Sequence, residues 1–201
     1  MKPKAIIRKF KLSGKNEIPW HLADEFKIEE WYRKTSDKMP DARVKLLYTD
    51  ERLYVRFDVK EDFIHAIHTD LQAWVCKDTC VEFFLSVDGT NYINYEMNCI
   101  GVYMCFKCRP VHQFERNPKG LKTTDFMVRT SLPQGKAIPE PVKCPPEGYF
   151  VEFSIPFDFL KGVFDCESPS PGTAWKANFY KCGSEVLTKS HWGSWSKIED
   201  D

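Results

Sequence analysis

The feature that most constrains the fold is a short stretch in which apolar and polar residues alternate. Residues 53–59 read LYVRFDV, with a period of two. This period belongs to a β-strand that has one buried face and one more polar face. Further segments follow the same rule, and we predict strands at 44–48, 79–87, 92–98, 101–107, 125–132, 149–155, 174–182 and 191–198.

Helical patterns are scarce between these segments. Only 23–32 and 157–161 are plausible helices, and the second begins directly after Pro156. Asp88-Gly89-Thr90-Asn91 is typical turn chemistry, so segments 79–87 and 92–98 should pair as an antiparallel hairpin. The proline-rich and glycine-containing segment 133–148 is expected to be a long loop within the domain. We therefore predict an all-β protein: one antiparallel, jelly-roll-like β-sandwich spanning 1–201, with one or two short helices.

Charge and hydropathy exclude several classes of partner. The chain has 29 basic and 29 acidic side chains, which argues against a nucleic-acid binder that neutralises phosphates. No apolar run approaches the roughly 20 residues of a membrane span. The N-terminus reaches Arg8 after three apolar residues and so does not resemble the core of a signal peptide. We expect a cytoplasmic protein if Met1 is the native start, and otherwise a periplasmic or secreted one.

Cysteine and aromatic residues are both unusually frequent. Eight cysteines in 201 residues are too few for a disulfide scaffold of this length, so we expect mostly free thiols. Aromatic residues make up 14% of the chain. This abundance suits strands, and it also suits a ligand-binding surface.

Four stretches, in this order, carry a resemblance to a known family: VKLLYTDERLYVRF (44–57), WVCKDTCVEFF (74–84), YEMNCIG (95–101) and WKANFY (175–180). A fifth, GYFVEFSIPF (148–157), ends in the proline expected after the matching strand. The chain resembles the family 9 carbohydrate-binding modules, within the wider group of DOMON-like sandwiches, over about residues 40–198. The resemblance implies non-catalytic binding of a mono- or oligosaccharide, in an accessory role alongside glycoside hydrolases.

The resemblance also implies the residues of a sugar site. Trp74 matches the position that stacks on the sugar ring, Glu82 a carboxylate that accepts sugar hydroxyls, and Asn98 an amide that donates and accepts. Glu96 stands where well-known members carry a basic residue, and Tyr180 occupies a further contact position. The underlying physics is general, because a pyranose stacks an apolar C–H face on an indole while its hydroxyls need oriented partners.

Family members carry a further segment after the strand that resembles 193–198, and it supplies a second aromatic wall. We expect Trp192 or Phe114 to supply that wall here, or the site to be open on one side. Plainer interpretations remain for each residue: Trp74 as a core or rim aromatic, Glu82 at a solvated edge, and the polar side chains of segment 92–98 as an ordinary solvated face. A scaffold with a degenerate site would fit the same pattern.

Other chemistries have weaker signals. Haem could be held by Met97, Met104 or His112, which makes a haem- or metal-binding DOMON-like protein the main alternative. The carboxylates of Glu82 and Glu96 on neighbouring strands could suggest a hydrolase.

Two metals can also be considered from the residue types. A structural zinc ion could draw on residues of the patterns Cys-x3-Cys and His-x2-His, with Cys76, Cys80, Cys99, Cys105, Cys108, His65 and His68 as candidates. The family can carry calcium that orders loops, for which the candidate oxygen donors are Asp41, Asp50, Asp58, Glu61 and Asp62.

Overall fold

The computed structural model describes residues 3–12, 17–33, 39–109, 113–116, 118, 125–187 and 190–198. Its strands are β1 Arg8–Lys9, β2 Glu25–Lys27, β3 Glu30–Arg33, β4 Asp41–Tyr48, β5 Arg52–Lys60, β6 Phe63–Ala66, β7 Cys80–Ser86, β8 Tyr92–Asn98, β9 Tyr103–Arg109, β10 Gln113–Arg116, β11 Met127–Thr130, β12 Ile138–Lys143, β13 Tyr149–Pro156, β14 Lys176–Cys182 and β15 Trp192–Ser194. Its helices are α1 Phe157–Phe164 and the 3-10 turns η1 Trp20–Leu22 and η2 Val75–Lys77.

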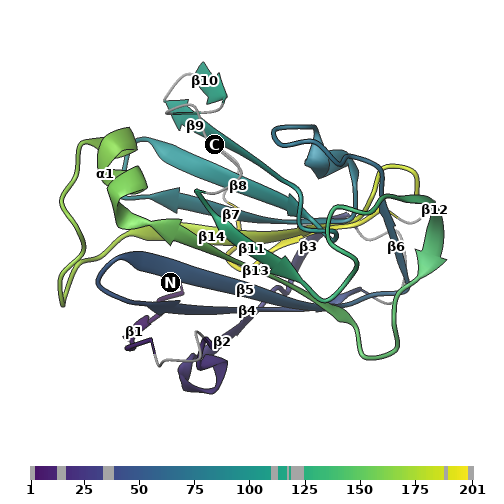
Figure 1. Ribbon diagram of the computed structural model, residues 1–201, viewed down its shortest axis with the longest axis horizontal. Helices are drawn as coiled ribbons and strands as arrows, with labels where there is room; N and C mark the ends of the chain where they lie inside the picture. The colour runs from purple at the N-terminus through teal and green to yellow at the C-terminus, as the bar shows by residue number, and fades with distance from the viewer. Residues whose placement is uncertain are drawn as a thin grey trace.

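Two sheets lie face to face, as Figure 1 shows. The six-stranded sheet runs in the order β1-β4-β5-β13-β11, with β2 paired to β4, and the seven-stranded sheet runs β10-β9-β8-β7-β14-β15-β3. Pairing is antiparallel except between β1 and β4. A separate pair, β6 with β12, lies at one end of the molecule (Figure 1). The predicted antiparallel β-sandwich is confirmed.

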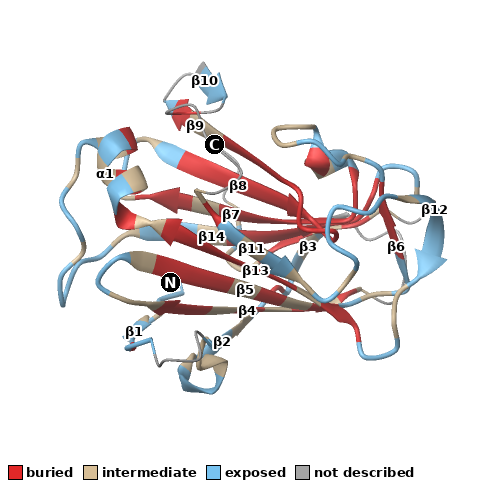
Figure 2. Cartoon of the chain, in the orientation of Figure 1, coloured by how far each residue is buried: buried red, intermediate tan, exposed pale blue. Residues whose placement is uncertain are grey.

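Aromatic side chains from both sheets fill the space between them. Phe57 of β5 packs edge-on against Phe179 of β14, with 6.2 Å between ring centroids, and Phe83 of β7 lies 6.4 Å from Phe153 of β13. The inner residues of the central strands are almost completely buried, whereas β10 and β12 are largely exposed (Figure 2). Burial of these rings is the main stabilising term of the fold.

The predicted turn joins β7 to β8 as an antiparallel hairpin. The Asp88 side chain accepts hydrogen bonds from the backbone N–H groups of Thr90 and Asn91, each at 2.8 Å. Gly89 has a φ of +77°, which only glycine adopts without strain. This turn sets the register of β7 and β8, on which the geometry of the site described below depends.

Helix α1 confirms the predicted helix after Pro156 and extends it to Phe164. Its residues Phe157, Leu160 and Val163 are buried, at a spacing that places them on one face. The helix ends where Asp165 adopts a left-handed conformation with φ +53°. Neither α1 nor the two 3-10 turns, the helices of the described ranges, has the length and apolar character needed to cross a membrane.

Two sequence predictions are wrong. Residues 23–32 do not form a helix but contain β2 and most of β3, which are short strands at the edges of the two sheets. Segment 133–148 is not all loop, because β12 lies within it and pairs with β6. Pro139 and Pro141 are compatible with β12 because it pairs on one side only and its pairing is irregular between Ile138 and Val142.

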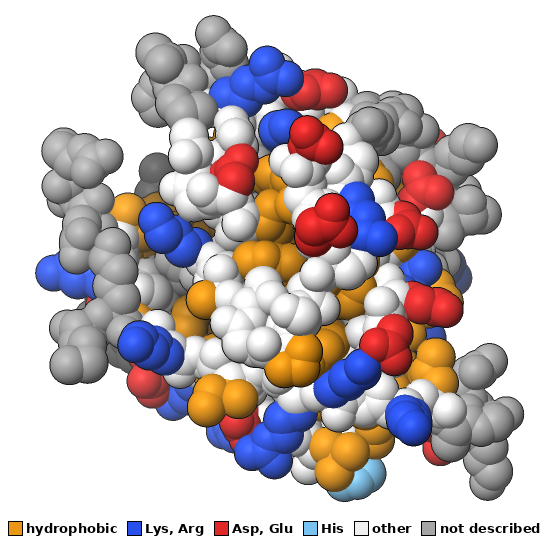
Figure 3. Space-filling view, turned by 90° about the vertical axis from the view of Figure 1, so that its left-hand side faces the viewer, with side chains coloured by type: hydrophobic (Ala, Val, Ile, Leu, Met, Phe, Trp, Pro, Cys, Tyr) orange, Lys and Arg blue, Asp and Glu red, His pale blue; other side chains and the backbone are white. Residues whose placement is uncertain are grey.

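Figure 3 shows the molecule from the side on which α1 lies in Figure 1. Basic and acidic side chains are interspersed on this face, with apolar patches between them. Neither sign of charge dominates there, which agrees with the balanced composition of the chain.

Candidate functional site

The outer face of the seven-stranded sheet carries an unusual pair of buried carboxylates. Along β7, Val81, Phe83 and Leu85 face the core, so Glu82 faces outward, and β8 alternates in the same way. Glu82 and Glu96 are directly opposite each other in the β7–β8 pairing. Both side chains are nevertheless buried, at 8% and 5% exposure.

Asn94 connects the two carboxylates. Its Nδ2 donates to Glu96 Oε1 at 2.8 Å and, with a longer contact of 3.4 Å, to Glu82 Oε2. No hydrogen bond of normal geometry reaches Glu96 Oε2 or Asn94 Oδ1 from the described residues. These three side chains form what we call the acidic floor: Glu82, Asn94 and Glu96. A ligand that carries hydrogen-bond donors would satisfy the two unpaired oxygens of this floor, Glu96 Oε2 and Asn94 Oδ1.

Burial controls the protonation of the acidic floor. Burial raises the pKa of Glu82, and hydrogen bonds from Cys182 and Asn94 oppose this effect only in part. Burial, followed by the negative charge of Glu82, raises the pKa of Glu96 to about 8. Two carboxylates this close resist ionising together, so near neutral pH the pair favours holding a proton.

Trp74 stands beside this floor in the loop between β6 and β7, and 53% of its side chain surface is exposed. The loop is held on one side of Trp74 by Gln72, whose side chain both donates to the carbonyl of Cys105 at 2.9 Å and accepts from its N–H at 2.7 Å. Two residues beyond Trp74, Cys76 lies against Glu96 and lowers its pKa, which places this loop next to the acidic floor. An exposed indole on an anchored loop is a suitable stacking surface.

Arg116 of β10 covers part of the indole. Its guanidinium carbon lies 4.5 Å from the centroid of the Trp74 ring, within range of a cation–π contact. The same side chain donates to the carbonyl of Gln72 and approaches Met104 Sδ at 3.4 Å. Since Met104 is the β9 neighbour of Glu96, Arg116 links the indole to the acidic floor.

Asn98, predicted as a sugar contact, is completely buried. Its Nδ2 donates to Asp78 Oδ2 at 2.8 Å and to the carbonyl of His68 at 2.9 Å, and its Oδ1 accepts from the N–H of Val102. Asp78 in turn accepts from the backbone N–H groups of Ile67 and His68. Asn98 therefore holds the base of the Trp74 loop.

Tyr180, also predicted as a contact, is the β14 neighbour of Glu82 and is 8% exposed. It lies between Phe84, at 4.6 Å between centroids, and Trp192, at 5.6 Å with nearly parallel rings. Trp192 also contacts Tyr32 at 4.8 Å. Trp192 thus belongs to an aromatic row that continues the floor on its β14 side. Phe114, the other candidate for a second wall, is 65% exposed on β10, 6.0 Å from Phe106.

The described residues considered as calcium or haem ligands do not form a common site. The calcium candidates Asp41, Asp50, Asp58 and Glu61 each form an ion pair with a basic side chain, namely Arg43, Lys9, Arg56 and Lys181. The haem candidates Met97 and Met104 lie on opposite faces of the sheet, and His112 lies outside the described residues.

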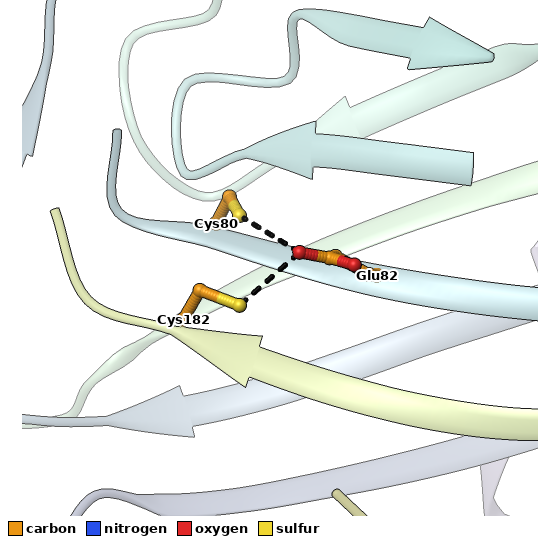
Figure 4. Close-up of side chains that lie close together, drawn as sticks. All are labelled: Cys80, Glu82 and Cys182. Carbon is orange, nitrogen blue, oxygen red and sulfur yellow. Dashed lines mark hydrogen bonds between the residues drawn. The ribbon is translucent and has the colours of Figure 1, made fainter. Parts of the chain in front are cut away.

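The zinc candidates of the sequence do not assemble as predicted. His65 hydrogen-bonds to Ser184 and His68 to Asp78, while Cys99 and Cys105 lie in the core. Cys80 instead joins Glu82 and Cys182 in a cluster whose three ligand atoms lie within 4.8 Å of one another (Figure 4).

Three residues of the observed site, Asn94, Arg116 and Cys182, were not among the predicted site residues. Asn94 shares the alternating polar face of β8 with Glu96, so the strand pattern could have included it. Arg116 and Cys182 carried no such signal. Arg116 reaches the site from the β9–β10 hairpin, and Cys182 is brought there by the pairing of β14 with the distant strand β7.

The profile of Carbohydrate-binding family 9 matches residues 12–201. Among curated protein sequences, none matches the chain significantly.

Solved structures share the fold. A protein from Bacteroides uniformis ATCC 8492 for which carbohydrate binding has been suggested is 24% identical, with a TM-score of 0.74 over 88% of this chain and 78% of that one. A family 9 module from Caldicellulosiruptor kristjanssonii, solved with glucose, is 15% identical, with a TM-score of 0.57 over 96% of this chain and 85% of that one. The same module with cellotriose gives the same identity and TM-score, over 96% and 84%.

Proposed function

The chain belongs to carbohydrate-binding family 9, whose members bind sugars without catalysis, and we propose that it holds its ligand on the outer face of the seven-stranded sheet. The site consists of Trp74 and the acidic floor, with Tyr180 at its β14 side. Trp74 supplies the stacking surface, and the floor supplies hydrogen-bond acceptors for the hydroxyls.

The observation that carries this assignment is the combination of an exposed indole with buried, incompletely hydrogen-bonded carboxylates. A buried polar oxygen without a partner costs free energy, which a donating sugar hydroxyl recovers. Glu96 Oε2 and Asn94 Oδ1 are two such oxygens. An ordinary solvated strand face would instead present exposed carboxylates to water.

The hydrogen-bond acceptors of the acidic floor and the guanidinium group of Arg116 beside it suit a ligand that carries both donors and acceptors, as a neutral sugar does. Arg116 donates where the floor accepts, so hydroxyls of either role find a partner near Trp74. Glucose and cellotriose, the ligands of the Caldicellulosiruptor module, are the first probes to use. A non-catalytic binder of this kind fits an accessory role beside glycoside hydrolases.

Phe114 is the better candidate for a second aromatic wall. It shares β10 with Arg116 at a spacing of two residues, so both side chains leave the strand on the same side. It is also the more exposed of the two rings considered, whereas Trp192 packs against Tyr180 and Tyr32.

The test is a calorimetric titration of the reduced full chain with glucose, cellotriose and a panel of other mono- and oligosaccharides. We expect at least one sugar to bind more tightly than about 1 mM, or about −4 kcal/mol. Trp74→Ala should weaken that binding at least about tenfold, because a central aromatic anchor dominates such sites. Phe114→Ala should weaken it less.

The matched control is Met127→Ala. Met127 is also 53% exposed but lies on β11 of the other sheet, so its removal should leave the affinity unchanged. Equal affinity in the native chain and in Trp74→Ala would contradict the proposed site.

A further inference from the structure

Two thiols and a carboxylate meet at the β14 side of the acidic floor. Cys182 Sγ lies 3.1 Å from Glu82 Oε1, and Cys80 Sγ lies 4.0 Å from the same oxygen (Figure 4). All three residues are buried, and Cys80 is only 1% exposed. Both thiols therefore converge on a single carboxylate oxygen.

The sheet brings these groups together by its register. Cys80 and Glu82 are two residues apart on β7, so their side chains share the outer face. Cys182 is the direct cross-strand partner of Cys80 on the neighbouring strand β14. Because both strands are central in the seven-stranded sheet, the positions of the three ligand atoms are set by backbone pairing and not by a loop.

The spacing matches tetrahedral coordination. With Zn–S bonds of about 2.3 Å and Zn–O bonds of about 2.0 Å, a tetrahedral zinc ion separates sulfur and oxygen ligands by about 3.5 Å. The observed separations from Glu82 Oε1, 3.1 and 4.0 Å, lie on either side of that value. Thiolate sulfur selects zinc and other soft metals over calcium and magnesium.

We propose that Cys80, Glu82 and Cys182 form a binding site for a zinc-like divalent cation. The three protein ligands leave the fourth tetrahedral position for water or another donor, an arrangement known from zinc sites that are not purely structural. The cation would bind at the β14 side of the acidic floor, beneath the protein surface.

The charges around the site favour a cation. The nearest titratable groups on neighbouring elements are Glu96 on β8 and Cys76 on η2, neither of which carries a positive charge. Lys181 follows Tyr180 on β14 but faces the opposite side, where it pairs with Glu61. No ion pair joins Glu82 to a basic side chain within the described ranges. A divalent cation would therefore balance the negative charge of the three ligands once they are deprotonated.

Without a metal, the surroundings of the three groups favour their protonated forms. Contact with Cys80 and burial raise the pKa of the Cys182 thiol, and burial raises that of the Glu82 carboxyl. Contact with Cys182 lowers the pKa of Cys80, but burial and the charge of Glu82 outweigh it. Each ligand atom must give up its proton to form a bond to the metal. Metal binding should therefore release two or three protons per ion, and the affinity for the metal should increase as the pH rises.

This site does not depend on the sugar proposal, because the two use different oxygens of Glu82. Oε1 faces the two thiols, whereas Oε2 faces Asn94. A sugar could thus bind above a loaded or an empty metal site, and each activity is measured without the other.

The test uses the full chain, reduced and stripped with a chelator, and titrates it with Zn²⁺ by calorimetry and with Co²⁺ by absorption spectroscopy. We expect one ion per chain, a thiolate-to-cobalt charge-transfer band, and proton release detected by repeating the titration in buffers of different ionisation enthalpy. Binding without the charge-transfer band would overturn the assignment, since the ion would then lie elsewhere.

Three variants locate the ion. Cys182→Ser and Glu82→Gln should each weaken Zn²⁺ binding by at least about 100-fold, since loss of even an outer partner of a metal ligand costs up to that much. Cys108→Ser should bind normally, because Cys108 is a buried thiol of the same sheet that lies on β9. Equal binding in all three variants, or none in the native chain, would overturn the proposal. Should Cys182→Ser fail to fold, Glu82→Gln decides, since it keeps the shape of the side chain.

Discussion

Buried carboxylates lie on both faces of the seven-stranded sheet, and they differ in whether a basic side chain pairs with them. On the core side, Glu61 forms an ion pair with the fully buried Lys181 at 3.1 Å and accepts a hydrogen bond from Tyr149 at 2.8 Å. On the outer side, Glu82 and Glu96 share one amide, and within the described part of the chain no basic side chain pairs with them. The first group is compensated internally, whereas the second depends on protons or on a ligand.

The difference shows how a buried charge can distinguish structure from function. The buried charge of Glu61 is balanced by Lys181, although among the described residues its Oε2 has only the longer contact with His191 at 3.5 Å, and removing the lysine leaves a strongly unfavourable charge. A buried carboxylate without a cation is costly in the isolated protein, and such groups concentrate at binding sites. Two adjacent residues of β14, Tyr180 and Lys181, therefore serve different groups, one on each face of the sheet.

The comparison is tested most strongly by removing the internal cation. Lys181→Met should lower the free energy of unfolding by about 3 to 5 kcal/mol, because Glu61 then stays buried without its partner. Denaturant unfolding measures this change. Lys176→Met, at an exposed position of the same strand, is the control and should change little. The double variant Lys181→Met with Glu61→Gln should recover most of the loss, and a Lys181→Met chain as stable as the native one would contradict our description of this pair.

The second test removes a charge from the acidic floor. The pKa of Glu96 is about 8 in the folded protein and near 4.5 when unfolded, so the native chain should lose stability as the pH rises through this window. Glu96→Gln carries no such proton, so by pH 8.5 it should be more stable than the native chain by at least about 2 kcal/mol, and near pH 4.5 the two should be similar. Unfolding curves across this pH range measure the difference. Glu115→Gln, at an exposed position, should follow the native profile.

The third test concerns the ligand. A sugar hydroxyl that donates to Glu96 favours the ionised carboxylate, so sugar affinity should increase between pH 6.5 and 9 by about 1.5 kcal/mol, at the lower end of the range for a hydrogen bond to a charged group. The increase should be absent in Glu96→Gln. Calorimetry at several pH values provides the measurement, and an affinity that instead falls with rising pH would show that the carboxyl group binds sugar as a donor.

The smallest effect belongs to a pair of charges at the protein surface. Arg8 and Asp24 form an ion pair at 2.7 Å with both side chains about half exposed. Arg8→Ala should change the free energy of unfolding by less than about 0.5 kcal/mol, and less still at high salt. A larger loss would mean that exposure is a poor guide to the value of a charge pair in this protein.

The central strands could be predicted because their sequences alternate and their turns are explicit. The segment 53–59 and the turn at Asp88-Gly89 gave β5 and the β7–β8 hairpin, and with them the opposition of Glu82 and Glu96. The edge strands β2 and β3 could not be recognised, since Ile28, Trp31 and Tyr32 have a spacing that also fits a helix. β12 was hidden because prolines normally indicate a loop.

The site was predicted less completely than the fold. Alternation shows which face Glu82 takes but not whether that face is buried, which depends on Tyr180 and Cys182 from a distant strand. The same limit applies to Asn98, the last residue of β8, after which the chain turns back into β9. Its side chain is taken up by Asp78 and His68, a pairing that no local pattern indicates.

The pairing of β7 with β14 has a further consequence for how the protein matures. Cys182 lies 100 residues after Glu82, so the hairpin that carries both floor carboxylates is synthesised long before the strand that encloses them. Folds dominated by such distant pairings form slowly, since the chain must close a long loop before the contact is gained. The floor therefore acquires its low polarity only when β14 has docked. Its ligands should bind only after the domain has folded completely, so ligand binding reports completed folding.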